Sequence, residues 1–298
     1  MQLNGILLVD KPQGITSHDV VDVLRKATGI RRIGHTGTLD PRATGLLVMC
    51  LGQATRLSQH LSGLDKTYEG ALRLGIITDS HDLDGTIVEE RPLPEGLSRE
   101  QVQAVCHEFL GDIEQIPPMV SAIKIGGRRL YKIAREGGEI ERPPRKVRVD
   151  QFEVLRWELP EAAIRVSCSS GAYVRTLCHD AGMRLGCGGV LAQLRRTRVG
   201  RYAIEDALPL DQYDSAERVA ERLISMNDAL HLPVVSVDAI QENILMSGRA
   251  LPARHLGISA SATGEWVQVK NQRGKLIALA LMQDTPAGMC VQPKTVFV

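Results

Sequence analysis

Residues 34–47 are the part of the chain best suited to chemistry. They read Gly-His-Thr-Gly-Thr-Leu-Asp-Pro-Arg-Ala-Thr-Gly-Leu-Leu, with one carboxylate, Asp40, between a leucine and a proline. Pro41 disfavours the helical conformation at Asp40, and Gly34 and Gly37 permit backbone angles that other residues resist. The loop therefore predicts a carboxylate held in a fixed direction. A turn in which Asp40 caps its own backbone is the simpler alternative.

Two basic segments favour a polyanionic ligand, although the net charge of the chain is only +1. Residues 120–149 contain nine Lys or Arg and three acids, and residues 175–201 contain six Arg and one Asp. Local positive potential attracts a polyanion more than global charge does. RNA is therefore a candidate ligand, with a solvated surface that is basic by chance as the alternative.

Further motifs follow the Asp40 loop in order. They are Asp-Lys-Pro-Gln-Gly-Ile-Thr-Ser at 10–17, Asp-Lys-Thr-Tyr at 65–68, Thr-Asp-Ser-His-Asp-Leu-Asp-Gly at 78–85, Pro-Pro-Met-Val-Ser-Ala-Ile-Lys at 117–124, Cys-Ser-Ser-Gly-Ala-Tyr-Val-Arg at 168–175 and Leu-Arg-Arg-Thr at 194–197. Together with the loop, they resemble the TruB family of tRNA pseudouridine synthases over nearly the whole chain. The combination is specific, whereas each motif alone would be weak evidence.

The resemblance implies isomerisation of uridine to pseudouridine in the T-loop of tRNA, at the uridine numbered 55. The bond between N1 and C1′ breaks, the uracil rotates, and C5 bonds to C1′, so no cofactor and no metal are expected. By resemblance, Asp40 is the catalytic residue. It attacks C1′ or removes the C2′ proton to give a glycal, and the sequence leaves both routes open. A glycosidase would normally need two carboxylates.

Arg175 is the expected partner of Asp40, again by resemblance. Asp40 must be ionised in a mostly dry pocket, where desolvation would raise its pKa. A guanidinium can oppose that shift by pairing bidentately with the carboxylate.

The remaining pocket residues are also assigned by resemblance. Tyr68 is expected to stack on the flipped uracil, since an aromatic face is a good platform for an unstacked base. Tyr173 and Leu194 are candidate pocket walls, and His35 is expected to contact the nucleotide or fill the place that the base leaves. For single residues of these types, a core or loop role is the simpler alternative.

Exposed basic residues are candidate contacts to the RNA backbone. Such contacts hold folded RNA without reading its sequence. The candidates are Lys124, Arg128, Arg129, Lys132, Arg195 and Arg196, with the basic residues of 142–148.

The chain departs from the family pattern at two positions. Val120 stands where the family usually has Tyr, and Ser170 stands where it often has Lys. A packing or RNA contact at Val120 and a backbone contact at Ser170 are therefore expected to be lost or replaced.

The elements that must position these residues favour an α+β fold with a mixed, largely antiparallel sheet, because strands and helices do not alternate strictly. Strands are predicted at 5–10, 45–51, 66–75, 113–116, 120–125, 147–157 and 162–168, and helices from Ser17 and at 54–61, 98–109, 174–185 and 214–230. Residues 1–232 are predicted to form the catalytic domain. Residues 233–298, with a hairpin at 266–281, are predicted to form a small β-barrel, where the family carries a PUA-type RNA-binding module.

The composition indicates the cellular environment of the protein and the kinds of site that it is not expected to contain. Six scattered cysteines without a Cys-x-x-Cys pair predict reduced thiols in a cytoplasmic protein rather than a disulfide framework or zinc ribbon. No secretory signal and no run of membrane-spanning length are recognised. We expect a monomer that binds tRNA without a protein partner.

Two other functions are compatible with parts of the sequence. An RNA-binding chaperone would keep the fold without turnover, but Asp40, Tyr68 and Arg175 would then have no chemical reason to be retained. A metal hydrolase using His35 and Asp40 is the weaker alternative, because two ligands in one loop without an obvious third make a poor site.

Overall fold

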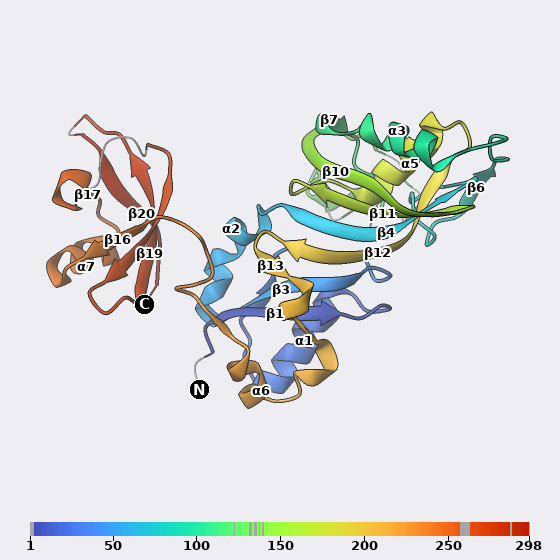
Figure 1. The fold of residues 1–298 in the computed structure, drawn as a ribbon. Coiled ribbons are helices and arrows are strands. Elements are labelled where there is room, and N and C mark those ends of the chain that lie inside the picture. Colours follow the sequence, from blue (N-terminus) through green and yellow to red (C-terminus); the bar gives the residue numbers. More distant parts are fainter. Residues whose placement is uncertain are drawn as a thin grey trace.

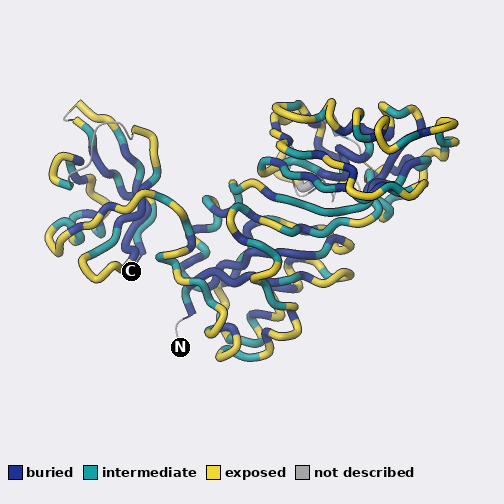
Figure 2. The backbone as a smooth tube through the Cα atoms, in the orientation of Figure 1, coloured by how far each residue is buried: buried dark blue, intermediate teal, exposed yellow. Residues whose placement is uncertain are grey.

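The structure is a computed structural model that describes residues 3–121, 123–130, 133, 136, 138, 140–256, 263–286 and 288–297. Within these residues, an 11-stranded mixed sheet is followed by a separate five-stranded sheet (Figure 1). The buried residues form runs along the strands of both sheets, and the loops are mostly exposed (Figure 2). No helix in this part of the chain is long and apolar enough to cross a membrane.

The large sheet places segments that are distant in sequence side by side. Its main path is β14 (Leu208–Pro209), β1 (Gly5–Lys11), β3 (Thr44–Leu51), β12 (Gly189–Val199), β4 (Lys66–Leu74), β11 (Glu161–Cys168), β10 (Arg145–Glu158) and β7 (Gly111–Gln115). The short strands β2 (Ile33–His35), β13 (Tyr202–Ala203) and β15 (Ile224–Ser225) pair outside this path. Only β1 with β14 and β3 with β12 are parallel along the described path. The predicted mixed, largely antiparallel sheet is confirmed.

Each half of the sheet, on either side of the middle strands, is covered by its own pair of helices (Figure 1). The helices α3 (Arg99–His107) and α5 (Val174–Arg184) pack over β4, β10 and β11 around a core that contains Phe152, Ile164 and Leu177. On the other half of the sheet, α1 (Ser17–Thr28) and α6 (Ala216–Glu221) pack against β1 and β3. A 3-10 helix (Gly52–Leu57) and α2 (Ser58–Ser62) lead from β3 towards β4.

The N-terminus of α1 differs by one residue from the prediction. Thr16, not Ser17, is the N-cap, and it forms a capping box with Asp19. Ser17 is buried instead, and its hydroxyl exchanges two hydrogen bonds with the backbone of Leu39. The predicted capping box of α3, formed by Ser98 and Gln101, is confirmed.

Two predicted elements are wrong in extent. The helix predicted at 214–230 ends at Glu221, because the chain then pairs with β1 through β15. The strand predicted at 120–125 is reduced to β8 (Lys124–Ile125), which pairs only with β9 (Arg128–Arg129). Val120 and Ser121 form a bend after two prolines.

The C-terminal sheet is curled and has its own core. Its order is β16 (Val234–Val237), β18 (Trp266–Asn271), β19 (Leu276–Gln283), β20 (Cys290–Val296) and β17 (Leu251–Pro252), with α7 (Ala239–Met246) packed against it. The predicted hairpin at 266–281 is confirmed as β18 and β19. Leu276, Leu279 and Phe297 belong to a core shared with the first part of the chain, and the Trp266 ring meets the His60 ring edge-on at 4.4 Å.

Candidate active site

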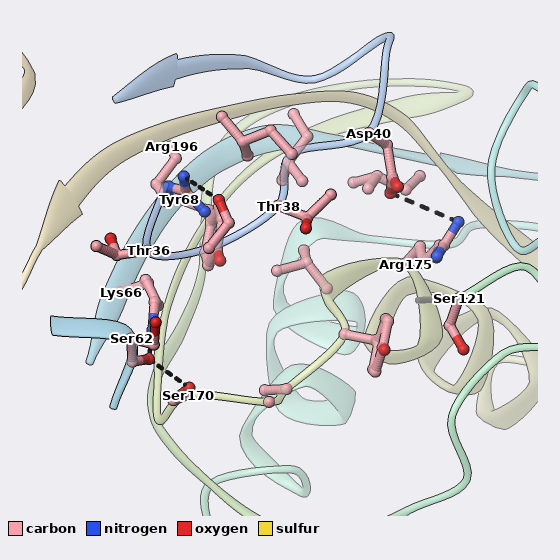
Figure 3. Close-up of a pocket in the computed structure, with 18 of the residues that line it drawn as sticks. Thr36, Thr38, Asp40, Ser62, Lys66, Tyr68, Ser121, Ser170, Arg175 and Arg196 are labelled. Atoms are coloured by element: carbon pink, nitrogen blue, oxygen red, sulfur yellow. Dashed lines mark hydrogen bonds and ion pairs between the residues drawn. The ribbon is translucent and has the colours of Figure 1, made fainter. Parts of the chain in front are cut away.

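A cavity of about 470 Å³ lies where the Asp40 loop, β4, β12 and the start of α5 meet (Figure 3). The predicted pocket residues His35, Asp40, Tyr68, Tyr173, Arg175 and Leu194 all line it. Other residues in its wall are Lys66, Ser121 and Arg196, together with the facing pair Ser62 and Ser170. The structure therefore brings together six residues that lie up to 159 positions apart (Leu194 minus His35).

The backbone on both sides of Asp40 is fixed by earlier residues of the chain. The Ser17 hydroxyl accepts from the Leu39 amide at 2.9 Å and donates to the Leu39 carbonyl at 3.1 Å. The Pro41 carbonyl accepts from the Gly14 amide at 2.8 Å and from the Lys11 ammonium at 3.3 Å. Because the loop is held at these points, the backbone that carries Asp40 has a defined position.

The loop ends at a position that admits no side chain. Gly45 pairs with Arg196 where β3 and β12 run parallel, and its φ is +99°. A Cβ atom there would lie 2.3 Å from the Arg196 carbonyl oxygen. The close approach of the two strands therefore requires glycine.

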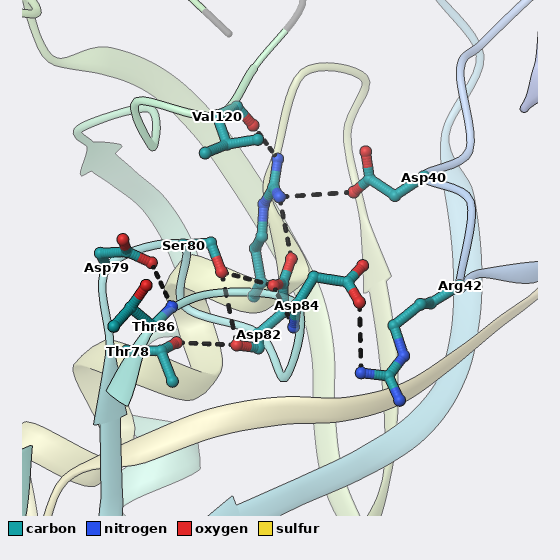
Figure 4. A network of polar contacts seen from close by, with 10 residues as sticks. Asp40, Arg42, Thr78, Asp79, Ser80, Asp82, Asp84, Thr86 and Val120 are labelled. Atoms are coloured by element: carbon teal, nitrogen blue, oxygen red, sulfur yellow. Dashed lines mark hydrogen bonds and ion pairs between the residues drawn. The ribbon is translucent and has the colours of Figure 1, made fainter. Parts of the chain in front are cut away.

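Arg175 connects Asp40 to a second carboxylate, that of Asp82. Figure 4 shows the two carboxylates on either side of one guanidinium. Its Nη1 lies 3.0 Å from Asp82 Oδ2 and 3.5 Å from Asp40 Oδ2, and its Nη2 donates to the Val120 carbonyl at 2.5 Å. The predicted bidentate pairing with Asp40 is wrong, because one nitrogen serves both carboxylates and Asp82 is the closer. The Arg175 side chain is 6% exposed and that of Asp40 is 50% exposed, so the expected dry surroundings are not present in the protein alone.

Asp82 lies in the motif at residues 78–85, but the sequence analysis did not single it out as a residue of the site. It lies in the loop between β5 (Ile76–Thr78) and β6 (Ile87–Glu90). Its Oδ1 accepts from the Ser80 hydroxyl at 2.5 Å and from the Asp84 amide at 3.0 Å, which leaves Oδ2 for Arg175. Three aspartates within residues 79–84 were the only local signal of this role.

A second ion pair joins the same two loops at the surface. Arg42 Nη1 lies 3.2 Å from Asp84 Oδ1, and both side chains are about half exposed. Burial and the neighbouring Asp82 raise the pKa of Asp84, and Arg42 opposes that shift. The Asp40 loop is therefore tied to the loop of residues 79–86 both through Arg175 and through Arg42.

The other end of the pocket contains two buried cations held by backbone carbonyls. Arg196 is 2% exposed, and its guanidinium donates to the Leu46 carbonyl at 2.7 Å and to the Gly37 carbonyl at 3.0 Å. Lys66 donates to the Ser62 and Leu64 carbonyls at 2.6 Å each. Burial, together with Arg196, lowers the pKa of Lys66 to about 8.

The role predicted for Arg196 needs correction on this geometry. A contact with the RNA backbone requires an exposed guanidinium, but this one is buried under the Asp40 loop. Arg195 points to the opposite face of the sheet, as successive residues of a strand do, and it binds Asp10 through both Nη atoms at 3.1 and 2.7 Å. The two adjacent arginines therefore do not share a surface.

Tyr68 and Leu194 come from neighbouring strands, β4 and β12, and line the middle of the pocket. Burial raises the pKa of Tyr68, so its ring is a neutral platform. His35 lies at the end of β2, where burial and Arg196 lower its pKa. It is therefore a neutral pocket residue near neutral pH.

Gln115 fixes the opposite wall and was not identified from the sequence. Its side-chain amide donates to the Tyr173 carbonyl at 3.1 Å and accepts from the Tyr173 amide at 2.7 Å. Tyr173 is the N-cap of α5, which carries Arg175. The Arg175 guanidinium carbon lies 5.6 Å from the centroid of the Tyr173 ring.

The two departures from the family pattern have local explanations. Val120 contributes its carbonyl to Arg175, and a backbone group is available whatever the side chain. The Ser170 hydroxyl donates to the Ser62 carbonyl at 2.8 Å, which links two segments that line the pocket (Figure 3).

Of the basic candidates within residues 124–132, the structure describes only the side chain of Arg128. Arg128 is exposed and pairs with Glu136 at 2.5 Å. Lys124 and Arg129 belong to the backbone pair of β8 and β9, and Lys132 lies outside the described residues. In the described part of the chain, no three or more His, Cys, Asp or Glu side chains form a group that could hold a metal ion.

Family models match most of the chain. A model for the N-terminal domain of the TruB family pseudouridylate synthases matches residues 25–174. A model for the C-terminal domain of tRNA pseudouridylate synthase B matches residues 175–237.

Individual relatives extend the match. A protein of Opitutus terrae named tRNA pseudouridine synthase B is 49% identical over 230 residues, covering 76% of this chain and 95% of that protein. A protein of Heliobacterium modesticaldum with the same name is 41% identical over 301 residues, covering 100% of this chain and 96% of that protein. Among solved structures, a Cbf5-Nop10-Gar1 complex contains a chain with a TM-score of 0.75 and 29% identity, covering 100% of this chain and 85% of its own. A chain of an H/ACA RNP bound to a substrate RNA containing 2'-deoxyuridine has a TM-score of 0.73 and 26% identity, covering 99% of this chain and 85% of its own.

Proposed function

The chain belongs to the TruB family of pseudouridylate synthases, and from this premise we propose that it isomerises the uridine numbered 55 in the T-loop of tRNA, with Asp40 as the catalytic carboxylate. The observation that carries the proposal is the position of Asp40. Its carboxylate is held on a fixed loop at the pocket, beside a buried guanidinium and on the same cavity as the Tyr68 ring. The chain is thus an isomerase that acts on uridine in tRNA.

The reaction breaks the bond between N1 and C1′ and forms one between C5 and C1′. Asp40 either bonds to C1′ or takes the proton from C2′, and the electron pair of the broken bond leaves with the uracil. After the uracil rotates, C5 bonds to C1′. In the same step the bond between Asp40 and C1′ breaks or, on the glycal route, Asp40 returns the proton to C2′, so that the carboxylate is regenerated. The C5 proton is then lost and N1 is protonated, so no oxidant, reductant or group donor is consumed.

The chain's own residues perform three tasks in this scheme. Arg175 keeps a positive charge beside Asp40, which favours the ionised carboxylate once RNA excludes water from the pocket. Tyr68 offers its ring to the flipped uracil, and Leu194 lines the same wall. Gln115 holds the start of α5, so that Arg175 approaches the loop from a fixed direction.

The domain division that we propose is residues 1–232 for catalysis and residues 233–298 for RNA binding. The second sheet begins with β16 at Val234 and has its own core, which supports this boundary. The exposed basic residue Arg128 remains a proposed contact to the RNA backbone, as do Lys124, Arg129 and Lys132. Since one chain supplies every pocket residue, we propose that the monomer is active without a protein partner.

The test is incubation of the purified protein with an unmodified tRNA transcript, without a cofactor. Pseudouridine is mapped by reverse-transcription stops that depend on carbodiimide treatment. We expect one stop, at the T-loop uridine, that is absent with Asp40→Asn and present with Asp22→Asn, a control at an exposed carboxylate of α1. Turnover by Asp40→Asn would refute the role of Asp40, and tRNA binding without any stop in the wild type would favour the chaperone function.

A further inference from the structure

Two histidines stack beside Arg175 and take no part in the reaction as proposed. The rings of His81 and His179 lie 3.9 Å apart at an angle of 6°. His81 directly precedes Asp82, and His179 lies on α5 four residues after Arg175. Both residues are half-buried.

His81 has an unusual backbone conformation. With φ at +67°, it is the one non-glycine residue with positive φ in the described part of the chain. Such a conformation persists where the surroundings enforce it. Here the His81 carbonyl accepts from the Leu191 amide at 3.0 Å, and Asp82 forms an isolated bridge with Leu191.

The stack and the ion pair together hold the loop at two adjacent points. Residues four apart in a helix lie on one face, so His179 and Arg175 present a ring and a guanidinium to the same loop. His81 meets the ring, and Asp82 meets the guanidinium at 3.0 Å. Together with the bonds from Ser80 and the Asp84 amide to Asp82 Oδ1, these two contacts constrain the direction of the Asp82 carboxylate.

The surroundings of the stack favour neutral rings. The charged groups that act on His81 are Arg175 of α5, Arg142 before β10 and Asp82 in its own loop, and His179 would add another positive charge if protonated. The Nδ1 atoms of both histidines are buried without a hydrogen-bond partner. Burial, then His179 and the two arginines, lowers the pKa of His81 to about 3, and burial lowers the pKa of His179.

We propose that His81 and His179 form a neutral positioning pair that fixes Asp82, and through Asp82 the Arg175 guanidinium, for the reaction at Asp40. This role rests on the function proposed above. It assigns the pair no contact with the RNA or the reacting atoms.

The first experiment compares single-turnover rate constants and tRNA dissociation constants. His81→Asn keeps a side chain that tolerates positive φ, and His179→Ala removes the facing ring. We expect each to lower the rate constant about 10- to 100-fold, since a small misplacement at a site has this effect, while tRNA affinity changes less than about twofold. His179→Phe retains a ring for the stack and should restore the rate to within about twofold of wild type.

The control is His107→Asn, at an exposed position at the end of α3, which should match the wild type. All rates are measured where circular dichroism shows each variant to be folded. If His81→Asn and His179→Ala both match the wild type, or if His179→Phe is as slow as His179→Ala, the pair is not a positioning pair.

The second experiment follows the histidine ring resonances from pH 8 to about pH 5. The His81 ring should stay neutral over this range, because burial lowers its pKa to about 3, and the His179 ring should titrate below the ordinary value of 6.5. Because the unfolded chain takes up protons that the folded chain refuses, the free energy of unfolding should fall as the pH drops below 6.5. Titration of both rings near 6.5 in the folded protein would overturn the proposal.

A third measurement separates this proposal from the function on which it rests. If the wild type converts no uridine in tRNA, the proposed function fails. The link between the stack and Asp82 is then judged by urea unfolding of His179→Ala, Asp82→Asn and the double variant. We expect non-additive changes because both residues hold one loop, and additive changes would refute the link.

Discussion

The two ends of the pocket each contain a buried guanidinium, but the partners of the two groups differ (Figure 3). Arg175 faces two carboxylates and one carbonyl. Arg196 is held by two carbonyls and lies near Lys66, and no carboxylate pairs with it among the described residues.

The difference in partners suits the two guanidinium groups to different tasks, one in the proposed reaction and the other in the stability of the loop. A buried cation beside a carboxylate can stabilise a negative charge that changes during a reaction, and Asp40 is placed for that role. A buried cation held by carbonyls instead satisfies backbone groups that would otherwise lack partners. Arg196 therefore supports the Asp40 loop from beneath, and in the proposed reaction Arg175 serves the chemistry at its tip.

Substitution of Arg175 by Gln should have the largest effect on the rate. It leaves Asp40 and Asp82 without the cation between them, and loss of such a preorganised charge costs about 100- to 1,000-fold. Single-turnover measurement of pseudouridine formation gives the rate constant. Arg184→Gln, at an exposed position of the same helix, is the control and should match the wild type. If Arg175→Gln were as active as the wild type, the two buried guanidinium groups would not differ in their tasks.

Substitution of Arg196 by Met should act on stability instead. The Leu46 and Gly37 carbonyls would lose their donor, and we expect the free energy of unfolding to fall by about 2–4 kcal/mol. Urea unfolding measures this change, with Arg198→Met on an exposed position of the same strand as the control. The rate constant of the folded variant should stay within about tenfold of wild type. A large loss of rate without a loss of stability would contradict the comparison.

Substitution of Arg42 by Met should have the smallest effect. It compares an exposed ion pair with the buried contacts of Arg175 at the same end of the pocket. The pair of Arg42 and Asp84 joins the same two loops as Arg175, but both side chains are about half exposed. Exposed ion pairs contribute about 0–1 kcal/mol, so the rate constant should change less than about threefold and the unfolding transition should barely move. A loss as large as that of Arg175→Gln would show that the exposed contact, not the buried one, orders the loops.

Much of the fold could be predicted because its signals are local. Strands such as β1 and β3 are continuous apolar runs, and the capping box of α3 is visible in the sequence. The strand β12 was not predicted, although it joins the two halves of the sheet. Its pairing with β4 shifts register near Gln193 and again before Arg198, and such irregularities break the alternation that marks a strand.

The pocket could be predicted where a motif contains the lining residue itself. Asp40 and the five other pocket residues were found in this way. The roles of Asp82 and Gln115 were missed because their partners are 93 and 58 residues away. The burial of Arg196 could not be predicted either, since it depends on which face of β12 turns towards the Asp40 loop.

Gly45 limits which substitutions the protein can accept in evolution, as well as the geometry of its loop. A methyl group at this position would force apart β3 and β12, which pair there in parallel. An exposed residue of the loop outside the pocket, such as Arg42, can change without a change elsewhere. A change at Gly45 would need a simultaneous rearrangement of a second strand that is encoded about 150 residues later. Descendants of this sequence are therefore free to vary Arg42 but must inherit the glycine at the base of the loop.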